Sequence, residues 1–222
     1  MTDEDREARW TGTFARLPSD KRARVLEAAK RAFAANGYSG ANVNKIAAEA
    51  GISVGSMYKY FRTKEDLFLA LIEDFHRLIE SSIDAILARE PRFLARVEAL
   101  LRAAAETSAA DPENVRIYIC CTTEELAPLA ARLSGNIEAA SAGRYRAMVV
   151  EAQAKGEVDP SVDPAWAAFF LDDLFLLLQY SYGSEYYRER LRVFLGVPEL
   201  PDPGTAVARL LGLAARALGA VA

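Results

Sequence analysis

Apolar residues recur at helical spacing along nearly the whole chain of 222 residues. The first clear helix is expected after a cap at Ser19-Asp20, where apolar positions fall one helical turn apart, and Asn36-Gly37 is a typical helix stop. Strictly alternating runs of β-branched residues, which would indicate strands, do not occur. The pattern therefore predicts an all-α fold.

The same periodicity predicts a succession of further helices. A short helix is expected after Asn42, a second short helix after Ser53, and a long helix from the capping-box-like start at Thr63. Beyond Pro91, the breaks at proline and glycine predict helices at residues 92–109, 114–127, 128–155, 164–182 with a continuation to 195, and 204–221.

The segment from Asn42 to Lys64 has a distinctive order: helix, glycine turn, helix, aromatic pair, basic exit. Gly51 fits the tight turn because a backbone with positive φ costs little only for glycine. The second helix, of about six residues, is too short to be stable alone, so its neighbours must hold it. This order is typical of a helix-turn-helix, whose second helix lies in the major groove of DNA. The segment therefore predicts DNA binding.

The distribution of charge agrees with this prediction. The net charge is −4, but residues 18–68 carry nine Lys and Arg against five Asp and Glu, whereas residues 69–222 carry fifteen against twenty-two. A basic module on an acidic body is expected when one patch meets phosphate. Residues 1–17 mix acids and bases and predict a loose arm without a secretory signal. The most apolar stretch, residues 165–180, is interrupted by two aspartates, so we expect a cytoplasmic protein with no membrane span.

Few side chains suggest catalysis or metal binding. Cys120 and Cys121 are adjacent and on a helix would point about 100° apart, which disfavours a bond between them. They are interpreted either as small buried hydrophobic residues or as a thiol sensor. With one histidine and no Cys-x-x-Cys pair, we expect no metal and no cofactor. The sequence offers no nucleophile–base set or phosphate loop, so we do not expect an enzyme.

A long motif at residues 46–67 reads Ile46-Ala47-x-x-Ala50-Gly51-Ile52-Ser53-x-Gly55-Ser56-x-Tyr58-x-Tyr60-Phe61-x-x-Lys64-x-x-Leu67. Together with Ala28-Ala29-x-x-x-Phe33 and Gly37-Tyr38, it resembles the TetR/AcrR family of bacterial transcriptional regulators. The resemblance covers about residues 18–70. It implies a flexible arm at residues 1–17, a helix-turn-helix domain at 18–66, and a ligand-binding and dimerisation domain at 67–222.

The resemblance also implies partners. The protein is expected to be a homodimer that binds double-stranded, palindromic operator DNA and to act as a repressor. A small-molecule effector bound in the C-terminal domain would release it, and composition alone suggests that this effector is largely apolar. Carried over by position, the implied DNA contacts are Asn42, Asn44, Ser53, Val54, Gly55, Ser56, Tyr58, Lys59, Tyr60 and Lys64.

Two of these positions depart from the family pattern. Position 54 is often Lys or a polar residue and position 44 is often Arg. Val54 can touch a thymine methyl group but forms no hydrogen bonds to bases, whereas Asn44 can pair with adenine. Base readout by the second helix is therefore thin, which favours a contribution either from DNA shape or from contacts by Asn44 and Lys59. A competing interpretation is that the aromatic residues of this segment pack in the core and its lysines are solvated. We adopt this interpretation for Phe61.

The predicted helices at residues 164–182 and 204–221 are unusually apolar. This favours an interface between subunits, although core packing explains their composition nearly as well. The residues predicted at a dimer interface are Trp166, Phe170, Leu174, Leu177, Leu210, Leu213, Ala214 and Ala217. The candidates for lining an effector site are Tyr118, Glu125, Tyr145, Phe169, Asp172, Asp173, Phe175 and Gln179. Asp172 and Asp173 are read either as ion-pair partners of an arginine, within or across the dimer, or as ligand contacts.

Two other classes of protein compete with a regulator. One is an enzyme housed in the C-terminal helices, for which the sequence offers no catalytic set. The other is a dimeric helical scaffold that has lost DNA binding, against which the intact Gly51, Ser56, Tyr58 and Lys64 argue.

Overall fold

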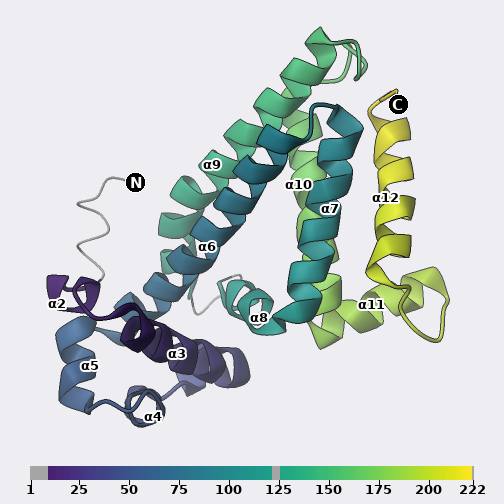
Figure 1. Ribbon diagram of the computed structural model, residues 1–222. Coiled ribbons are helices and arrows are strands. Elements are labelled where there is room, and N and C mark those ends of the chain that lie inside the picture. The colour runs from purple at the N-terminus through teal and green to yellow at the C-terminus, as the bar shows by residue number, and fades with distance from the viewer. Residues whose placement is uncertain (1–9, 122–125, 222) are drawn as a thin grey trace. The chain divides into compact units, whose positions relative to one another are not determined.

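The computed structural model describes residues 10–121 and 126–221. Every regular element within these ranges is a helix (Figure 1), so the predicted all-α fold is confirmed. The chain divides into two compact units, which we call the N-terminal unit (residues 1–78 and 116–130) and the C-terminal unit (residues 79–115 and 131–222). Among the described helices, none has both the length and the apolar character needed to cross a membrane.

The N-terminal unit is built from α2 (Gly12–Ala15), α3 (Ser19–Gly40), α4 (Val43–Glu49), α5 (Val54–Tyr60) and the first part of α6 (Lys64–Arg89). Helices α2, α4 and α5 are each too short to be stable alone, so they depend on packing in a shared apolar core. The fully buried side chains at the centre of this core are Val25, Phe33, Ile46, Met57, Phe61, Leu67 and Phe68.

Two expectations for the start of this unit are wrong. Ser19 does not cap α3: the N-cap is Pro18, which offers no side-chain acceptor, and Asp20 instead pairs with Arg24 at 3.2 Å. The expected loose arm does not extend to residue 17. Its last part forms the helical turn α2, and Phe14 is buried against the core.

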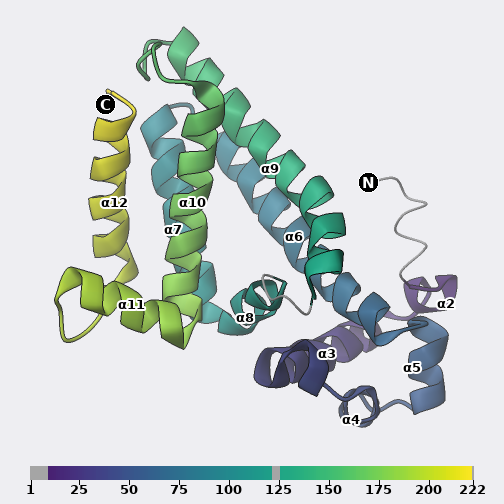
Figure 2. The same cartoon turned by 180° about the vertical axis from the view of Figure 1, so that it is seen from behind.

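The C-terminal unit contains α7 (Phe93–Ala110), α9 (Ala127–Ala154), α10 (Pro164–Gly183), α11 (Glu185–Leu195) and α12 (Pro203–Ala217), apart from the first residues of α9. Helix α7 packs against both α10 and α12, and the three run side by side in both views (Figure 1, Figure 2). Its core includes apolar side chains from four of these helices: Phe93, Val97, Leu101, Val149, Leu171 and Val207.

Three predicted helix boundaries differ from the structure. Helix α12 ends at Ala217 instead of the expected residue 221. Helix α8 (Pro112–Cys120) ends earlier than the expected residue 127. The predicted continuation of α10 to residue 195 is broken at Ser184, where the backbone is extended (φ −126°, ψ 134°) before α11 begins. Gly183, the last residue of α10, packs closely on Val115 of α8. A Cβ atom added at residue 183 would lie 2.5 Å from that side chain.

Charged side chains tie helices of the C-terminal unit together at two places. Arg144 of α9 forms a fork with Asp84 of α6, with Nε–Oδ1 at 2.7 Å and Nη2–Oδ2 at 3.0 Å, and its Nη1 lies 3.3 Å from Glu80. Such two-bond pairs fix geometry as well as adding attraction. The arginine holds the pKa of Asp84 below its usual range by hydrogen bonding to the carboxylate.

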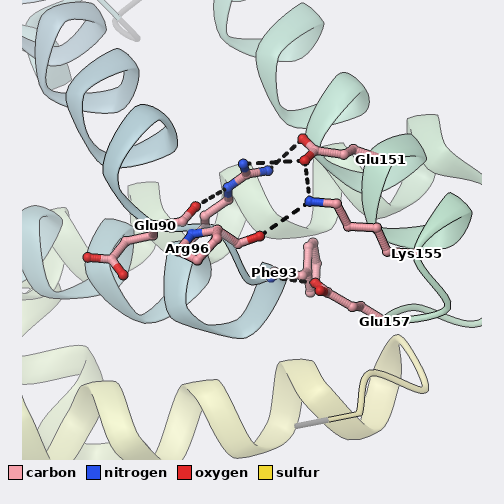
Figure 3. Close-up of polar contacts among 7 residues, drawn as sticks. Glu90, Phe93, Arg96, Glu151, Lys155 and Glu157 are labelled. Atoms are coloured by element: carbon pink, nitrogen blue, oxygen red, sulfur yellow. Dashed lines mark hydrogen bonds and ion pairs between the residues drawn. The ribbon is translucent and has the colours of Figure 1, made fainter.

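The second tie joins the start of α7 to the end of α9 (Figure 3). Arg96 donates to the Glu90 carbonyl at 2.7 Å and to the Glu151 carboxylate at 2.7 Å, and Lys155 donates to the same carboxylate. Glu157 accepts the backbone N–H of Phe93 at 2.7 Å, which satisfies one of the open donors at the start of α7. This network fixes the turn between α6 and α7 to α9.

Candidate nucleic-acid interface

Helix α4 begins and ends through local hydrogen bonds that the sequence predicts. The side chain of Asn42 accepts the backbone N–H groups of Asn44 and Lys45 at 2.9 and 3.2 Å. At the other end Gly51 has φ 68°, and its N–H and that of Ile52 donate back to carbonyls in the last turn of α4. This pattern is a Schellman motif, which needs a left-handed residue at the position of Gly51. The predicted glycine turn is therefore confirmed.

Helix α5 begins at a serine cap. Ser53 accepts the N–H of Ser56 at 3.1 Å, and the two hydroxyls lie 2.9 Å apart. Met57 is buried and anchors the helix in the core. The opposite face is open to solvent: the exposed fraction of Tyr58 is 50%, and Val54, Gly55 and Lys59 are also exposed. Helix α5 therefore presents a small, hydroxyl-bearing and basic face.

Two residues expected at the DNA interface have other contacts. Tyr60 is only 5% exposed and its ring lies 5.7 Å from that of Phe14, so it packs in the core instead of facing outward. Lys64 is half-buried; its Nζ donates to the Ser39 carbonyl at 3.0 Å and lies 4.8 Å from the centre of the Tyr38 ring. Lys64 thus joins the start of α6 to the end of α3.

The charge around the turn and α5 is positive. Residues 42–64 contain four basic residues, Lys45, Lys59, Arg62 and Lys64, against the single acid Glu49. Arg31 holds that acid at 2.7 Å. Lys45, Lys59 and Arg62 are exposed, so this surface attracts a polyanion. Lys45 is a basic residue of this surface that the sequence reasoning overlooked.

The segment before α3 also reaches this site, which the sequence reasoning missed. Thr11 donates from its hydroxyl and its N–H to the last two carbonyls of α5, and Phe14 packs on Tyr60 and Phe61. A signal was present in the sequence: Trp10 and Phe14 are spaced one helical turn apart in an otherwise polar segment, and their rings lie 6.1 Å apart.

Most of the residues predicted at a dimer interface are exposed or half-buried. Trp166 and Leu213 are 72% and 54% exposed, while Leu177 and Ala217 are also exposed. Phe170, Leu174 and Leu210 are half-buried. The prediction for Ala214 is wrong, because it is 1% exposed and packs inside the unit. Helices α10 and α12 thus carry large apolar side chains in contact with solvent.

The effector candidates do not all gather at one place. Tyr145 of α9 and Phe175 of α10 are buried with their rings 5.3 Å apart in a T-shaped contact. Phe169 is instead 59% exposed, and its ring lies 6.2 Å from that of Trp166, so it does not lie with this buried pair. The half-buried candidates are Tyr118, Asp172, Asp173 and Gln179, and Glu125 lies outside the described residues.

The cysteines differ from reactive thiols. Neither forms a disulfide, both are half-buried, and burial raises the pKa of the Cys121 thiol to about 12. Because the thiolate is the reactive form, this environment makes Cys121 inert and favours its interpretation as a small hydrophobic residue. Over the ranges that the structure describes, no group of His, Cys, Asp and Glu side chains is arranged to hold a metal ion.

Helices α3, α4 and α5, with a glycine turn between the last two, form a helix-turn-helix domain. Residues 25–71 match the family model described as "Bacterial regulatory proteins, tetR family". The helix-turn-helix domain of the chain thus matches that of the TetR family of bacterial regulatory proteins.

Relatives agree with this assignment. The chain is 44% identical over 64 residues to the HTH-type transcriptional repressor AcnR of Corynebacterium glutamicum, a match that covers 28% of this chain and about a third (34%) of that repressor. Over nearly its full length it is similar to the crystal structure of a TetR family transcriptional regulator from Chloroflexus aurantiacus, with a TM-score of 0.63, 26% identity, and coverage of 94% and 98%.

The structure of AibR in complex with isovaleryl coenzyme A and operator DNA shares the fold, with a TM-score of 0.62, 19% identity, and coverage of 87% and 96%.

Proposed function

We propose that the protein is a repressor that binds operator DNA through α5 and releases it when a small effector binds in the C-terminal unit. The observation that carries the proposal is the exposed face of α5, where Tyr58 and Lys59 stand clear of a helix that is fixed at both ends. Hydroxyl and ammonium groups on such a face are donors for phosphate oxygens. The match of residues 25–71 to a family of bacterial regulatory proteins, and the similarity to the repressor AcnR, support the same conclusion.

The contacts that we propose divide into two kinds. Tyr58, Lys59 and Lys45 grip phosphates, while Val54, Gly55 and Asn44 face base edges. Asn42, Ser53 and Ser56 act mainly through the helix ends that they cap, since their side chains are engaged there. Lys64 retains donor capacity beyond its bond to Ser39, so a phosphate contact from it remains part of the proposal.

The test of DNA binding is fluorescence anisotropy with a labelled duplex from the region upstream of the protein's own gene. We expect the wild-type protein to prefer this duplex over a scrambled one, and its affinity to fall with salt. Lys59→Ala should weaken binding and lower the slope of log affinity against log salt by about 0.9. Tyr58→Phe, which removes only the hydroxyl, should weaken binding without changing this slope.

Lys155→Ala is the matched control because it removes the same charge from the C-terminal unit. It should leave affinity and slope unchanged while Lys59→Ala alters both. A wild-type protein that binds neither duplex would support the scaffold alternative, and one that binds operator and scrambled duplex equally well would also overturn the proposed function.

We further propose that α10 and α12 of two copies meet to form a homodimer. Trp166, Leu177 and Leu213 support this, because large apolar side chains are rarely left in water on this scale without a partner. A two-fold dimer also matches a palindromic operator. Leu213→Glu should convert the dimer to a monomer in analytical ultracentrifugation. Val150→Glu, which changes an exposed residue of α9, should leave the dimer intact.

For the effector, we propose a small, largely apolar molecule bound near Tyr145 and Phe175, with the half-buried Asp172 and Gln179 as polar contacts. The support is the aromatic pair itself, since effector sites combine apolar walls with a few polar groups. Isovaleryl coenzyme A, with which AibR forms a complex, is a suitable first probe because its isovaleryl group is small and apolar. Release of operator DNA by the probe, abolished in Phe175→Ala, would support this site; a folded variant that responds like wild type would contradict it.

A further inference from the structure

The end of α5 is held by a residue that lies far away in the sequence. Thr11 donates its hydroxyl to the Lys59 carbonyl at 2.6 Å and its N–H to the Tyr60 carbonyl at 3.0 Å. These are the last two carbonyls of α5, which have no partner within the helix because a helix leaves its final carbonyl groups open. Thr11 therefore acts as a C-terminal cap supplied from 48 residues upstream.

The segment that carries Thr11 is itself anchored. Phe14 is 2% exposed, and its ring lies 4.7 Å from that of Phe61 and 5.7 Å from that of Tyr60. At its other end, Arg22 of α3 donates to the Ala15 carbonyl at 2.9 Å. We call residues 11–17 the N-terminal strap. The strap links α3 to the end of α5 through buried rings and hydrogen bonds.

We propose that the N-terminal strap positions α5 for DNA recognition and that Thr11 is a positioning residue for operator binding. The inference rests on the proposed function. Helix α5 has seven residues, so it depends on external contacts to keep its geometry. Ser53 fixes its start and Thr11 fixes its end, and the carbonyl that Thr11 holds belongs to Lys59 itself.

The consequence for binding follows from preorganisation. If the last turn of α5 frays, the backbone that bears Tyr58 and Lys59 must be ordered again when DNA binds, and this ordering reduces affinity. Thr11 contributes to affinity by preventing that loss, without touching the DNA. Its removal should therefore change affinity but leave the number of phosphate contacts, and hence the salt slope, unchanged.

The experiment compares three single variants in the anisotropy assay with the upstream duplex. Thr11→Val keeps the shape of the side chain but loses the hydroxyl donor, and we expect operator affinity to fall about fivefold, the size of effect that one net hydrogen bond has. Thr11→Ser retains the donor and should restore most of the affinity. Thr13→Val makes the same substitution at an exposed residue of the same turn and should behave like wild type.

Two further readouts separate positioning from other roles. The salt slope of Thr11→Val should equal that of wild type, whereas Lys59→Ala lowers it. Amide hydrogen exchange in the last turn of α5 should be faster in Thr11→Val, while the melting temperature stays close to that of wild type.

Equal operator affinity of wild type and Thr11→Val would overturn the inference alone. A lowered salt slope in Thr11→Val would also overturn it, because the residue would then contact phosphate directly. Failure of the wild-type protein to distinguish operator from scrambled duplex would overturn the proposed function, and the inference with it.

Discussion

Arg96 of α7 and Glu151 of α9 are joined side by side, with Nη1–Oε2 at 2.7 Å and Nη2–Oε1 at 3.5 Å (Figure 3). The arginine side chain is mostly buried, at 12% exposure, while the carboxylate is 43% exposed. Hydrogen bonds from Arg96 and then from Lys155 lower the pKa of Glu151 from 4.5 to about 2. The pair therefore links the stability of the C-terminal unit to pH.

The first prediction is a loss of stability in acid that depends on Glu151. Since the folded state holds the lower pKa, the carboxylate stabilises the fold above pH 4.5, and this contribution disappears as the pH falls toward 2. The melting temperature of Glu151→Gln should be lower than that of wild type at pH 7, and the difference should vanish near pH 2. Solvent screening of the exposed carboxylate keeps the effect modest and makes it smaller at high salt.

Glu98→Gln is the control for this measurement, because Glu98 is a carboxylate on α7 that pairs with Arg102 only one turn away, on the exposed side of the helix. Such pairs contribute little to stability. Wild type and Glu151→Gln melting in parallel from pH 7 to pH 2 would show that the network does not stabilise the fold.

The second prediction concerns the cap of α4. Asn42→Ala leaves two backbone N–H groups without their acceptor and should lower the free energy of unfolding by about 1 kcal/mol in a urea titration. Asn42→Asp keeps the acceptor and should stay close to wild type. Asn44→Ala is the matched control, because it makes the same substitution two residues further along the chain. If Asn44→Ala lowered the free energy of unfolding as much as Asn42→Ala does, this would argue against the capping role.

The third prediction tests the close contact of Gly183 with Val115. Replacing a helical glycine by alanine normally stabilises by about 1 kcal/mol, but here the new Cβ would lie 2.5–2.7 Å from three atoms of Val115. Overpacking of this kind costs about 1–3 kcal/mol, so Gly183→Ala should lower the free energy of unfolding. Gly143→Ala, where an added Cβ meets no atom within 4 Å, should raise it.

The double variant Val115→Ala, Gly183→Ala provides the check on this mechanism. Removing the two valine methyl groups eliminates two of the three close contacts of the new Cβ, those at 2.6 and 2.7 Å, so the double variant should be more stable than the sum of the two single effects. Simple additivity would mean that the glycine matters for another reason.

The fourth prediction concerns the thiol of Cys121. With its pKa raised to about 12, almost none of it is thiolate at pH 8, so alkylation by iodoacetamide should be far slower in the folded protein than in urea. The measurement uses Cys120→Ser, so that mass spectrometry counts one thiol. Equal rates in the folded and unfolded protein would revive the thiol-sensor interpretation.

Much of the fold follows from local sequence signals. The caps at Asn42 and Ser53, the glycine turn at Gly51 and the reciprocal bonds between Thr63 and Asp66 all involve residues within a few positions of each other. Hydrophobic periodicity predicts single helices but not the contacts between them. For this reason it predicted α6 and α10 well but extended α10 past Ser184, where the backbone is extended, and it did not reveal the close contact of Gly183 with Val115.

The site was harder to predict where side chains contact residues that are far away in the sequence. Tyr60 looks like a phosphate ligand by its position next to Lys59, yet the ring of Phe14 covers it. Lys64 likewise meets Ser39, which precedes it by 25 residues. Such contacts depend on how the helices pack, and no spacing rule along the chain reveals them.

The location of the N-terminal strap has a practical consequence for protein engineering. The family match begins at residue 25, so the strap lies entirely before the region that defines the family. A chimeric regulator made by transplanting only residues 25–71 would carry the complete motif but leave the Lys59 and Tyr60 carbonyls without Thr11. A graft of this DNA-binding domain should therefore start at Trp10, ahead of the first residue that the family pattern defines.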